Sequence, residues 1–242
     1  VGYLALEANT TASNNVAIGA EALNDNTTGT RNVAVGYAAL DAATTVNDNT
    51  AVGHDALTAN TSGFKNTAIG SGAGEGNTTG DNLVAVGFNA AENNTTADDN
   101  TAVGSQALFT NTTGASNVAI GTGAMYNSTT ASNNVAMGKS AAENITTGDT
   151  NICIGISAAD TLTTGNSNII IGNTARPSAS GGANQIAMGV VATCVGDNNF
   201  TFGNQGTDSN IAFGATSITA PSDIRLKEDI QDEEVGLDFI ND

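Results

Sequence analysis

The sequence has few of the residues from which most globular cores and active sites are made. Its 242 residues include no tryptophan, 4% aromatic residues, two prolines, two cysteines and one histidine. Cys153 and Cys194 do not occupy equivalent positions of the sequence repeat, so we expect two free thiols and no disulfide framework. His54 stands alone, and no Ser-His-Asp triad can be assembled around it.

Positive charge is also scarce. The chain has 6 basic and 24 acidic residues, a net charge of −18, which disfavours binding to nucleic acid phosphates. The carboxylates lack EF-hand spacing and recur in no fixed pair, so we expect no metal, no cofactor and no enzymatic activity in the repeats. No run of residues is long and apolar enough to predict membrane insertion, and no signal peptide is evident. The chain begins inside a repeat, and we expect it to be part of a longer protein.

The dominant feature that is present is a repeated motif. The segment NNVAIGAEAL at 14–23 returns as RNVAVGYAAL at 31–40 and as DNTAVGHDAL at 48–57. A fixed step of this size, without insertion or deletion, is typical of proteins whose units stack on their neighbours. The step is 17 residues, and the motif glycines are Gly2, Gly19, Gly36, Gly53, Gly70, Gly87, Gly104, Gly121, Gly138, Gly155, Gly172 and Gly189.

The repeats can be compared with one another column by column. The residue before the motif glycine is always Val, Ile or Met, and the residue three after it is always Ala, so both columns are predicted to face packed neighbours. The residue directly after the glycine varies without chemical preference, as Tyr37, His54 and Lys139 illustrate, and is predicted to face solvent.

The motif predicts a short β-strand. Alternate side chains point to opposite faces, so Val16 and Ile18 share one face while Ala17 and Gly19 share the other. A second strand is predicted in the AEAL-type segment and a second turn in the NTTG-type segment, as at 26–29. The predicted fold is an all-β parallel β-roll or β-solenoid of twelve 17-residue repeats. At ~4.8 Å per coil it would be a rod of roughly 55 to 60 Å.

An asparagine recurs four residues before most motif glycines. We expect its side chains to form a structural ladder from coil to coil. The column contains Asn15, Asn32, Asn49, Asn66, Asn100, Asn117, Asn134, Asn151 and Asn168.

One coil offers little apolar volume to bury, so a single roll would have a thin core. The face carrying Ala17 and Gly19 has side chains small enough for another chain to approach closely. We therefore predict several identical rolls packed around a shared axis through that face.

The regular step defines three segments: the repeats at 1–192, an irregular region and neck at 193–221, and a charged segment at 222–242. After Gly189 the intervals to the next motif glycines shorten to 14 and then 11 residues, and larger residues such as Phe200 and Phe202 arrive. Such changes are typical of a terminal cap. In the last segment, apolar residues at helical spacing follow a Ser222-Asp223 N-cap, which predicts the start of a helix.

Two family resemblances follow from these motifs. The N-x-A-[VI]-G repeats resemble the head repeats of the YadA-like trimeric autotransporter adhesins, although the 17-residue step is longer than theirs; this resemblance implies a left-handed, homotrimeric β-roll. The SDIRLK sequence at 222–227, followed by GLDFI at 236–240, is similar to the opening of the intramolecular chaperone domain of the endosialidase family. That domain ends phage tail fibres and tailspikes, trimerises, and cuts itself off.

The second resemblance implies a self-cleavage site. By position, the nucleophile would be Ser222, its base Lys227, and the scissile bond Pro221-Ser222. A lysine kept neutral by burial can accept the hydroxyl proton. Only the first 21 residues of the domain would be present.

The function expected is a receptor-binding fibre of a phage tail, homotrimeric and located on the virion. Its partner would be a glycan or protein receptor on the host surface. The alternatives are a bacterial surface adhesin or extracellular filament, an ice-binding solenoid that uses paired threonines such as Thr78-Thr79, and a glycan hydrolase.

Overall fold

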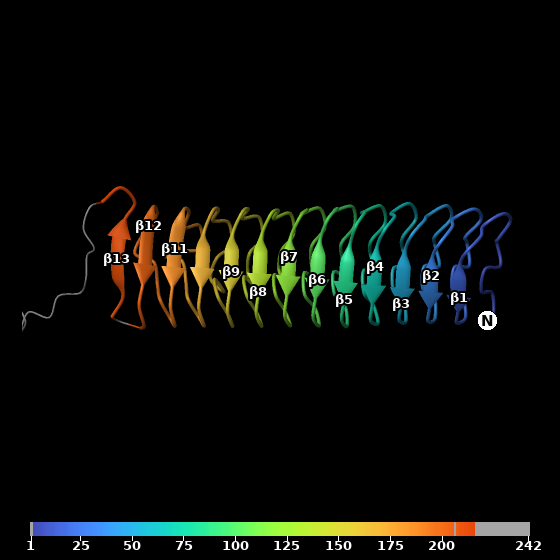
Figure 1. Ribbon diagram of the computed structural model, residues 1–242, viewed down its shortest axis with the longest axis horizontal. Helices are drawn as coiled ribbons and strands as arrows, with labels where there is room; N and C mark the ends of the chain where they lie inside the picture. Colours follow the sequence, from blue (N-terminus) through green and yellow to red (C-terminus); the bar gives the residue numbers. More distant parts are fainter. Residues whose placement is uncertain (1, 206, 216–242) are drawn as a thin grey trace, which may run out of the picture.

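The computed structural model describes residues 2–205 and 207–215, and it is a straight rod built on a single sheet (Figure 1). The sheet has 13 strands, and each strand pairs with its neighbours in sequence order. The strands are β1 Val16–Ile18, β2 Val33–Val35, β3 Thr50–Val52, β4 Thr67–Ile69, β5 Val84–Val86, β6 Thr101–Val103, β7 Val118–Ile120, β8 Val135–Met137, β9 Ile152–Ile154, β10 Ile169–Ile171, β11 Gln185–Met188, β12 Asn199–Phe202 and β13 Ser209–Ala212.

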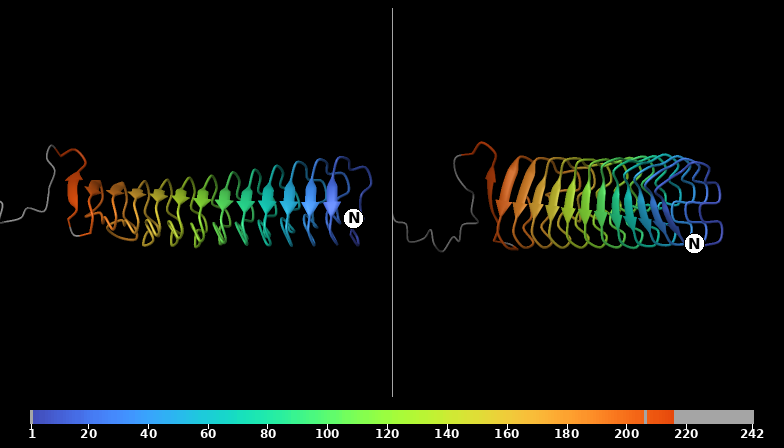
Figure 2. Two further views of the ribbon diagram at one scale, coloured as in Figure 1. Left: turned by 60° about the horizontal axis from the view of Figure 1, so that its bottom comes forward. Right: turned by 45° about the vertical axis from the view of Figure 1, so that its right-hand side comes forward.

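The strand register follows the sequence repeat. Val16 pairs with Val33 and Ala17 with Ala34, and the parallel pairing keeps this 17-residue offset as far as β11. Equivalent residues of successive repeats therefore stack in columns along the rod. The predicted all-β parallel β-solenoid with a 17-residue step is confirmed, and Figure 2 shows the strands aligned along one side of the rod.

The predicted second strand is wrong. The segment after each motif glycine forms turns in which alternate residues have positive φ, as at Glu21 (61°) and Leu23 (51°). This alternation curls the backbone tightly instead of extending it. The backbone still bonds to the next coil, since Leu23 N–H donates to the Ala39 carbonyl at 3.0 Å. Left-handed leucine is unfavourable by itself, and this bond together with full burial of the side chain offsets that cost.

The predicted assignment of the two strand faces is also wrong. Ala34 and Ala51, in the centres of β2 and β3, are completely buried within this one chain, so the alanine face points into the coil. The aliphatic residues on either side of the alanine point outward, and Ile18 is 51% exposed. The alanine three after the motif glycine is buried as predicted in every coil from Ala22 onward, for example Ala56.

The interior of each coil is narrow, and few side chains fill it. In most coils toward the N-terminus it holds two alanines, one leucine four residues after the glycine, and asparagines. The apolar volume is relocated where the leucine is missing. Gly74 occupies the leucine position of its coil, and a Cβ there would lie 3.2 Å from the Leu83 side chain, so Leu83 fills this space from the asparagine column.

The rod ends in a change of strand direction. β12 pairs with β11 in parallel after a shortened offset, Gln185 with Asn199, and β13 then pairs antiparallel to β12. The aromatic rings of Phe200 and Phe202 lie 5.2 Å apart on β12. The chain between the last two motif glycines is too short for another coil, so it folds back as a hairpin.

Candidate functional site

The predicted self-cleavage residues Ser222 and Lys227, with the Pro221-Ser222 bond, lie outside the described residues. The same holds for the predicted helix in the segment 222–242. The described residues that could form a site are the columns of side chains stacked along the solenoid.

The motif glycines form one column at the edge of the sheet. From Gly19 to Gly189 their φ angles lie in the positive region, for example 130° at Gly104, where side chains are rarely tolerated. The next coil also approaches closely, because a Cβ on Gly104 would lie 2.7 Å from the carbonyl carbon of Gly121. The repeated glycine is thus required by the backbone and carries no chemistry of its own.

The predicted asparagine ladder is present. Asn15 accepts the Asn32 backbone N–H at 2.8 Å, and Asn32 accepts that of Asn49 at 3.0 Å. Each side chain also donates across its coil, as Asn49 does to the Gly63 carbonyl at 3.0 Å. These groups are satisfied by bonds within and between coils, which assigns the column a structural role.

A second asparagine ladder, which the sequence pattern did not predict, runs beside the first. Asn60 also donates to the Gly63 carbonyl, at 2.9 Å, so two ladders converge on one acceptor. The side chains of this ladder bond to one another, as Asn111 does to Asn94 at 2.8 Å. The signal lay in the NTTG-type segment, whose first residue was interpreted only as part of a turn. The buried members are Asn26, Asn60, Asn77, Asn94 and Asn111.

The paired threonines occupy a bend beside this second ladder. The first hydroxyl of each pair donates to the next coil, as Thr78 does to the Thr95 carbonyl at 2.9 Å. The second threonine, such as Thr79, is exposed. One column of hydroxyls is therefore engaged in bonds along the rod, and the other is exposed.

The outer face of the sheet is a continuous apolar surface. It consists of the first and third residues of β1 to β10 and their equivalents in β11 and β12, which are Val, Ile, Thr, Met or Phe without a single charge. Several are well exposed, including Ile18 at 51%, Ile69 at 42% and Met188 at 43%. The column directly after the glycine is largely exposed, as predicted, and lies along one side of this face; it contains Phe88 and Ile156 but also polar residues and Lys139. We call the strand residues alone the outer sheet face.

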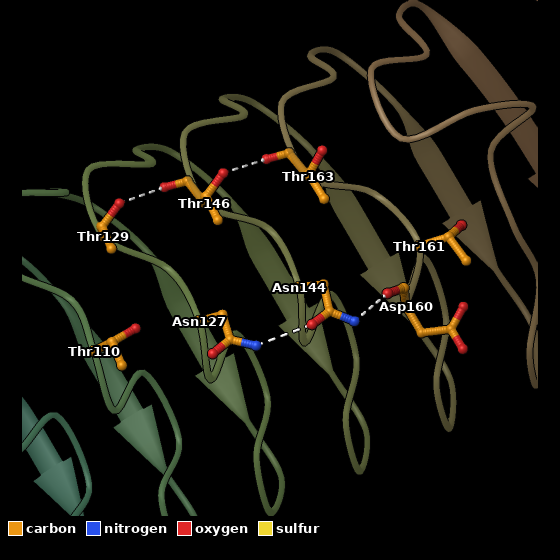
Figure 3. Close-up of a pocket in the computed structure, with 8 residues that line it drawn as sticks. All are labelled: Thr110, Asn127, Thr129, Asn144, Thr146, Asp160, Thr161 and Thr163. Atoms are coloured by element: carbon orange, nitrogen blue, oxygen red, sulfur yellow. Dashed lines mark hydrogen bonds between the residues drawn. The ribbon is translucent and has the colours of Figure 1, made fainter.

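A groove of about 670 Å³ runs along a different side of the rod (Figure 3). One wall carries a threonine row and the other an amide and hydroxyl row. Asn127 donates to Asn144 at 2.9 Å, and Asn144 donates to the Asp160 carbonyl at 2.7 Å, so the amides are held in line (Figure 3). The lining residues are Thr110, Asn127, Thr129, Asn144, Thr146, Asp160, Thr161 and Thr163, all from the bends and none from a strand.

The remaining candidate residues are isolated. His54 contacts Asp55 at 2.7 Å and stacks on Tyr37 with ring centroids 5.1 Å apart. Cys153 and Cys194 are buried and unbridged, and burial raises the pKa of their thiols to about 12 and about 11. Such thiols are inert as nucleophiles near neutral pH.

Charged groups are spread over the surface, and two ion pairs tie coils together. Arg31 binds Asp48 and Arg176 binds Asp160, each through two guanidinium nitrogens. Burial, together with the nearby Asp25, raises the pKa of the Asp41 carboxyl, and burial beside Glu75 raises that of Glu92. Among residues 2–205 and 207–215, no three His, Cys, Asp or Glu side chains converge as a metal site.

The described part of the chain contains no helix with the length and apolarity needed to cross a bilayer. Comparisons of the chain with protein-family models, with curated proteins and with solved structures found no match.

Proposed function

We propose that this chain is a shaft and receptor-binding segment of a homotrimeric extracellular fibre, of the kind found in phage tail fibres and tailspikes. The observation that carries the proposal is the outer sheet face, an apolar strip without charge that follows the whole rod. The SDIRLK segment at 222–227 supports the phage assignment by its resemblance to self-cleaving chaperone domains.

The size of the outer sheet face favours a covered surface. Twelve parallel strands at ~4.8 Å spacing, each about 10 Å long, give roughly 600 Å². Soluble monomers rarely expose a contiguous apolar patch of more than a few hundred Å². About 800 Å² per partner is usual in a stable interface. The exposed Phe88 and Ile156 beside the strip add apolar area at two coils, and the other members of their column, such as Ser105 and Lys139, would form a polar rim.

Copies of the same chain are the partners that suit this face best. A second rod has the same coil spacing, so its side chains can interdigitate with the first along the full length. A partner with any other repeat distance would lose register after a few coils. The number three comes from the resemblance to trimeric adhesins and to trimeric fibre chaperones.

The test is the assembly mass of the 242-residue chain by native mass spectrometry, with an outer-face variant beside it. Ile120→Glu places a charge in the centre of the face and is expected to convert a trimer into folded monomers with an unchanged circular dichroism spectrum. Thr113→Glu adds the same charge at an exposed bend and is expected to leave the trimer intact. A wild-type chain that is a soluble, folded monomer at all concentrations would contradict the proposal.

Maturation is tested separately, in a chain extended by a complete chaperone domain. Cleavage is expected between Pro221 and Ser222 and is expected to be lost in Ser222→Ala and Lys227→Ala. Intact-mass measurement locates the cut. Cleavage at another bond, or undiminished cleavage in both variants, would remove the phage assignment and leave a bacterial surface adhesin as the alternative for the same trimeric rod.

A further inference from the structure

The groove in Figure 3 is lined by hydrogen-bonding side chains from four successive coils. The position six residues after the motif glycine is Ala42, Ala59 and Gly76 in three successive coils, Asn93 in the next, and Thr110, Asn127, Asn144 and Thr161 in the four coils of the groove. Hydrogen-bonding side chains thus replace small apolar ones in the same column. The repeat itself does not require them, because the earlier coils fold without them.

We propose that this groove binds a short linear, uncharged oligosaccharide; the inference deepens the proposed receptor-binding function and rests on it. The groove spans four coils, or about 14 Å at ~4.8 Å per coil. That is the length of a short oligosaccharide lying along the rod.

The two walls match the two kinds of surface on a sugar ring. The threonine hydroxyls of one row point along the rod, with Thr129 donating to the Thr146 carbonyl at 3.1 Å and Thr146 to the Thr163 carbonyl at 3.2 Å. Their methyl groups are turned toward the amide row (Figure 3). The threonine wall therefore offers an apolar surface to the C–H face of a sugar ring. Mostly apolar lining with a few fixed polar groups is typical of small-molecule sites.

The amide row provides the polar contacts. The bonds from Asn127 to Asn144 and from Asn144 to the Asp160 carbonyl orient both side chains before a ligand arrives. Each amide has two N–H donors and one carbonyl acceptor, so each keeps capacity for a sugar hydroxyl. Orientation in advance lowers the entropic cost of binding.

Charge and backbone geometry exclude two other ligand classes. The chain has a net charge of −18, and Arg176, the cation beside the groove, is held by both oxygens of Asp160 at 2.9 and 3.0 Å, which disfavours acidic glycans. An extended peptide normally binds through main-chain bonds to a strand edge. Here the backbone of the threonine row is engaged, since Thr146 N–H donates to the Thr163 carbonyl at 2.8 Å.

The groove stays accessible in the proposed assembly. Its lining residues come from bends, whereas the outer sheet face consists of strand residues. A trimer packed through the strands would present three identical grooves. Weak single sites would then act together on a surface coated with repeated glycans.

The experiment measures binding of neutral hexasaccharides to the full chain by calorimetry and by Thr-methyl NMR. The probes are the β-1,4-linked N-acetylglucosamine hexamer and maltohexaose, with a sialic acid oligomer as the acidic probe. A neutral probe is expected to bind and to shift the methyl signals of Thr129, Thr146 and Thr163 but not that of Thr27. The double variant Asn127→Ala/Asn144→Ala is expected to bind about tenfold more weakly, because two hydrogen bonds are lost.

Asn93→Ala is the matched control. Asn93 occupies the same column and donates to the Phe109 carbonyl at 3.0 Å, as Asn144 does to Asp160, but it lies outside this groove. Its removal is expected to leave the affinity unchanged. The inference is overturned if neither neutral probe binds, if the acidic probe binds more tightly than both, or if the double variant binds as well as the wild type.

The assembly mass of the same samples separates this inference from the proposed function. A trimer that binds no neutral probe keeps the fibre and removes the groove as a glycan site. A monomer that binds one through Asn127 and Asn144 keeps the groove and removes the homotrimeric fibre.

Discussion

On the inner face of the sheet the central residue of most regular strands is a small, buried alanine, whereas on the outer face its two neighbours are Val, Ile, Met or Thr and are partly exposed. Ala102, in the middle of β6, has no exposed surface, while Val103 beside it is half-buried. A sheet with one face in water usually has the reverse pattern, with large apolar residues inside. The difference shows that interior volume decided which face turns inward.

The coil can bury alanine because the opposite wall and the two amide ladders fill the remaining space. Leu108 is completely buried in the same coil as the fully buried Asn111. The interior is thus closely packed but poor in aliphatic surface. Hydrogen bonds between coils do much to fix which residues stack on one another. The outer sheet face keeps the aliphatic surface available for a partner.

The largest effect is expected where the inner wall approaches the next coil. Gly104→Ala combines a positive φ with a Cβ 2.7 Å from the Gly121 carbonyl carbon, and we expect a loss of about 3 kcal/mol or more in unfolding free energy. Urea denaturation followed by circular dichroism measures it. Gly196→Ala is the control, since a Cβ there meets nothing within 4 Å, and its stability is expected to stay near the wild-type value. Equal stability of the two variants would contradict the role of the glycine column.

The relocated core residue gives the next effect. Leu83→Asn restores the ladder residue but removes the side chain that fills the space beside Gly74, so we expect a net loss of about 2 kcal/mol. The double variant Leu83→Asn/Gly74→Leu recreates the composition of the coil around Leu57 and is expected to recover most of that loss. Denaturation of both variants at one protein concentration measures the coupling. If the two changes are simply additive, the two positions do not share one space.

The two strand faces are compared directly by a pair of neighbouring substitutions. Ala102→Val adds methyl groups to the closed interior and is expected to cost about 1 to 2 kcal/mol. Val103→Thr keeps the shape on the outer sheet face and is expected to change the stability of the folded coil by less than about 0.5 kcal/mol. Thermal unfolding at low protein concentration measures both. A larger effect at Val103 than at Ala102 would reverse the assignment of the two faces.

The smallest effect concerns the acidic outer bends. The pKa of Asp41 is raised in the folded chain, by burial first and then by Asp25 and other nearby carboxylates. The folded state therefore binds this proton more tightly than the unfolded state, and the contribution to stability is present at low pH and lost as pH rises through the raised pKa. Asp41→Asn is expected to stabilise the rod at pH 7 by less than about 1 kcal/mol and to have no stabilising effect at pH 3. Thermal unfolding at the two pH values measures this difference; greater stabilisation at pH 3 than at pH 7 would contradict the sign.

Much of the fold could be predicted because the repeat is so regular. The step between Gly19 and Gly36 predicted both the stacking and the register, and the recurrence of Asn15, Asn32 and Asn49 predicted a ladder that the structure contains. The second asparagine ladder could not be predicted from the sequence, because asparagine is also common in turns. The turn at 20–23 was interpreted as a strand because residues such as Glu21 and Leu23 rarely adopt positive φ, and nothing in their side chains marks that conformation.

The candidate sites were less predictable. The groove depends on the distance between two bends, so Asn127, Asn144 and Thr146 could not be grouped from the sequence, although each belongs to a visible column. The proposed cleavage residues Ser222 and Lys227 come from a resemblance and stay a prediction.

By itself the sequence determined that this protein stacks coils of equal length in one register. A shift of one coil by one residue relative to the next would place side chains against the closely packed glycine column. Only the tertiary structure decided which way the coil closes. Positive φ angles at the turns bend the backbone so that the alanines lie inside and the aliphatic residues outside. That choice depends on how much volume a 17-residue coil can enclose, a property of the closed loop that no single column of the repeat contains.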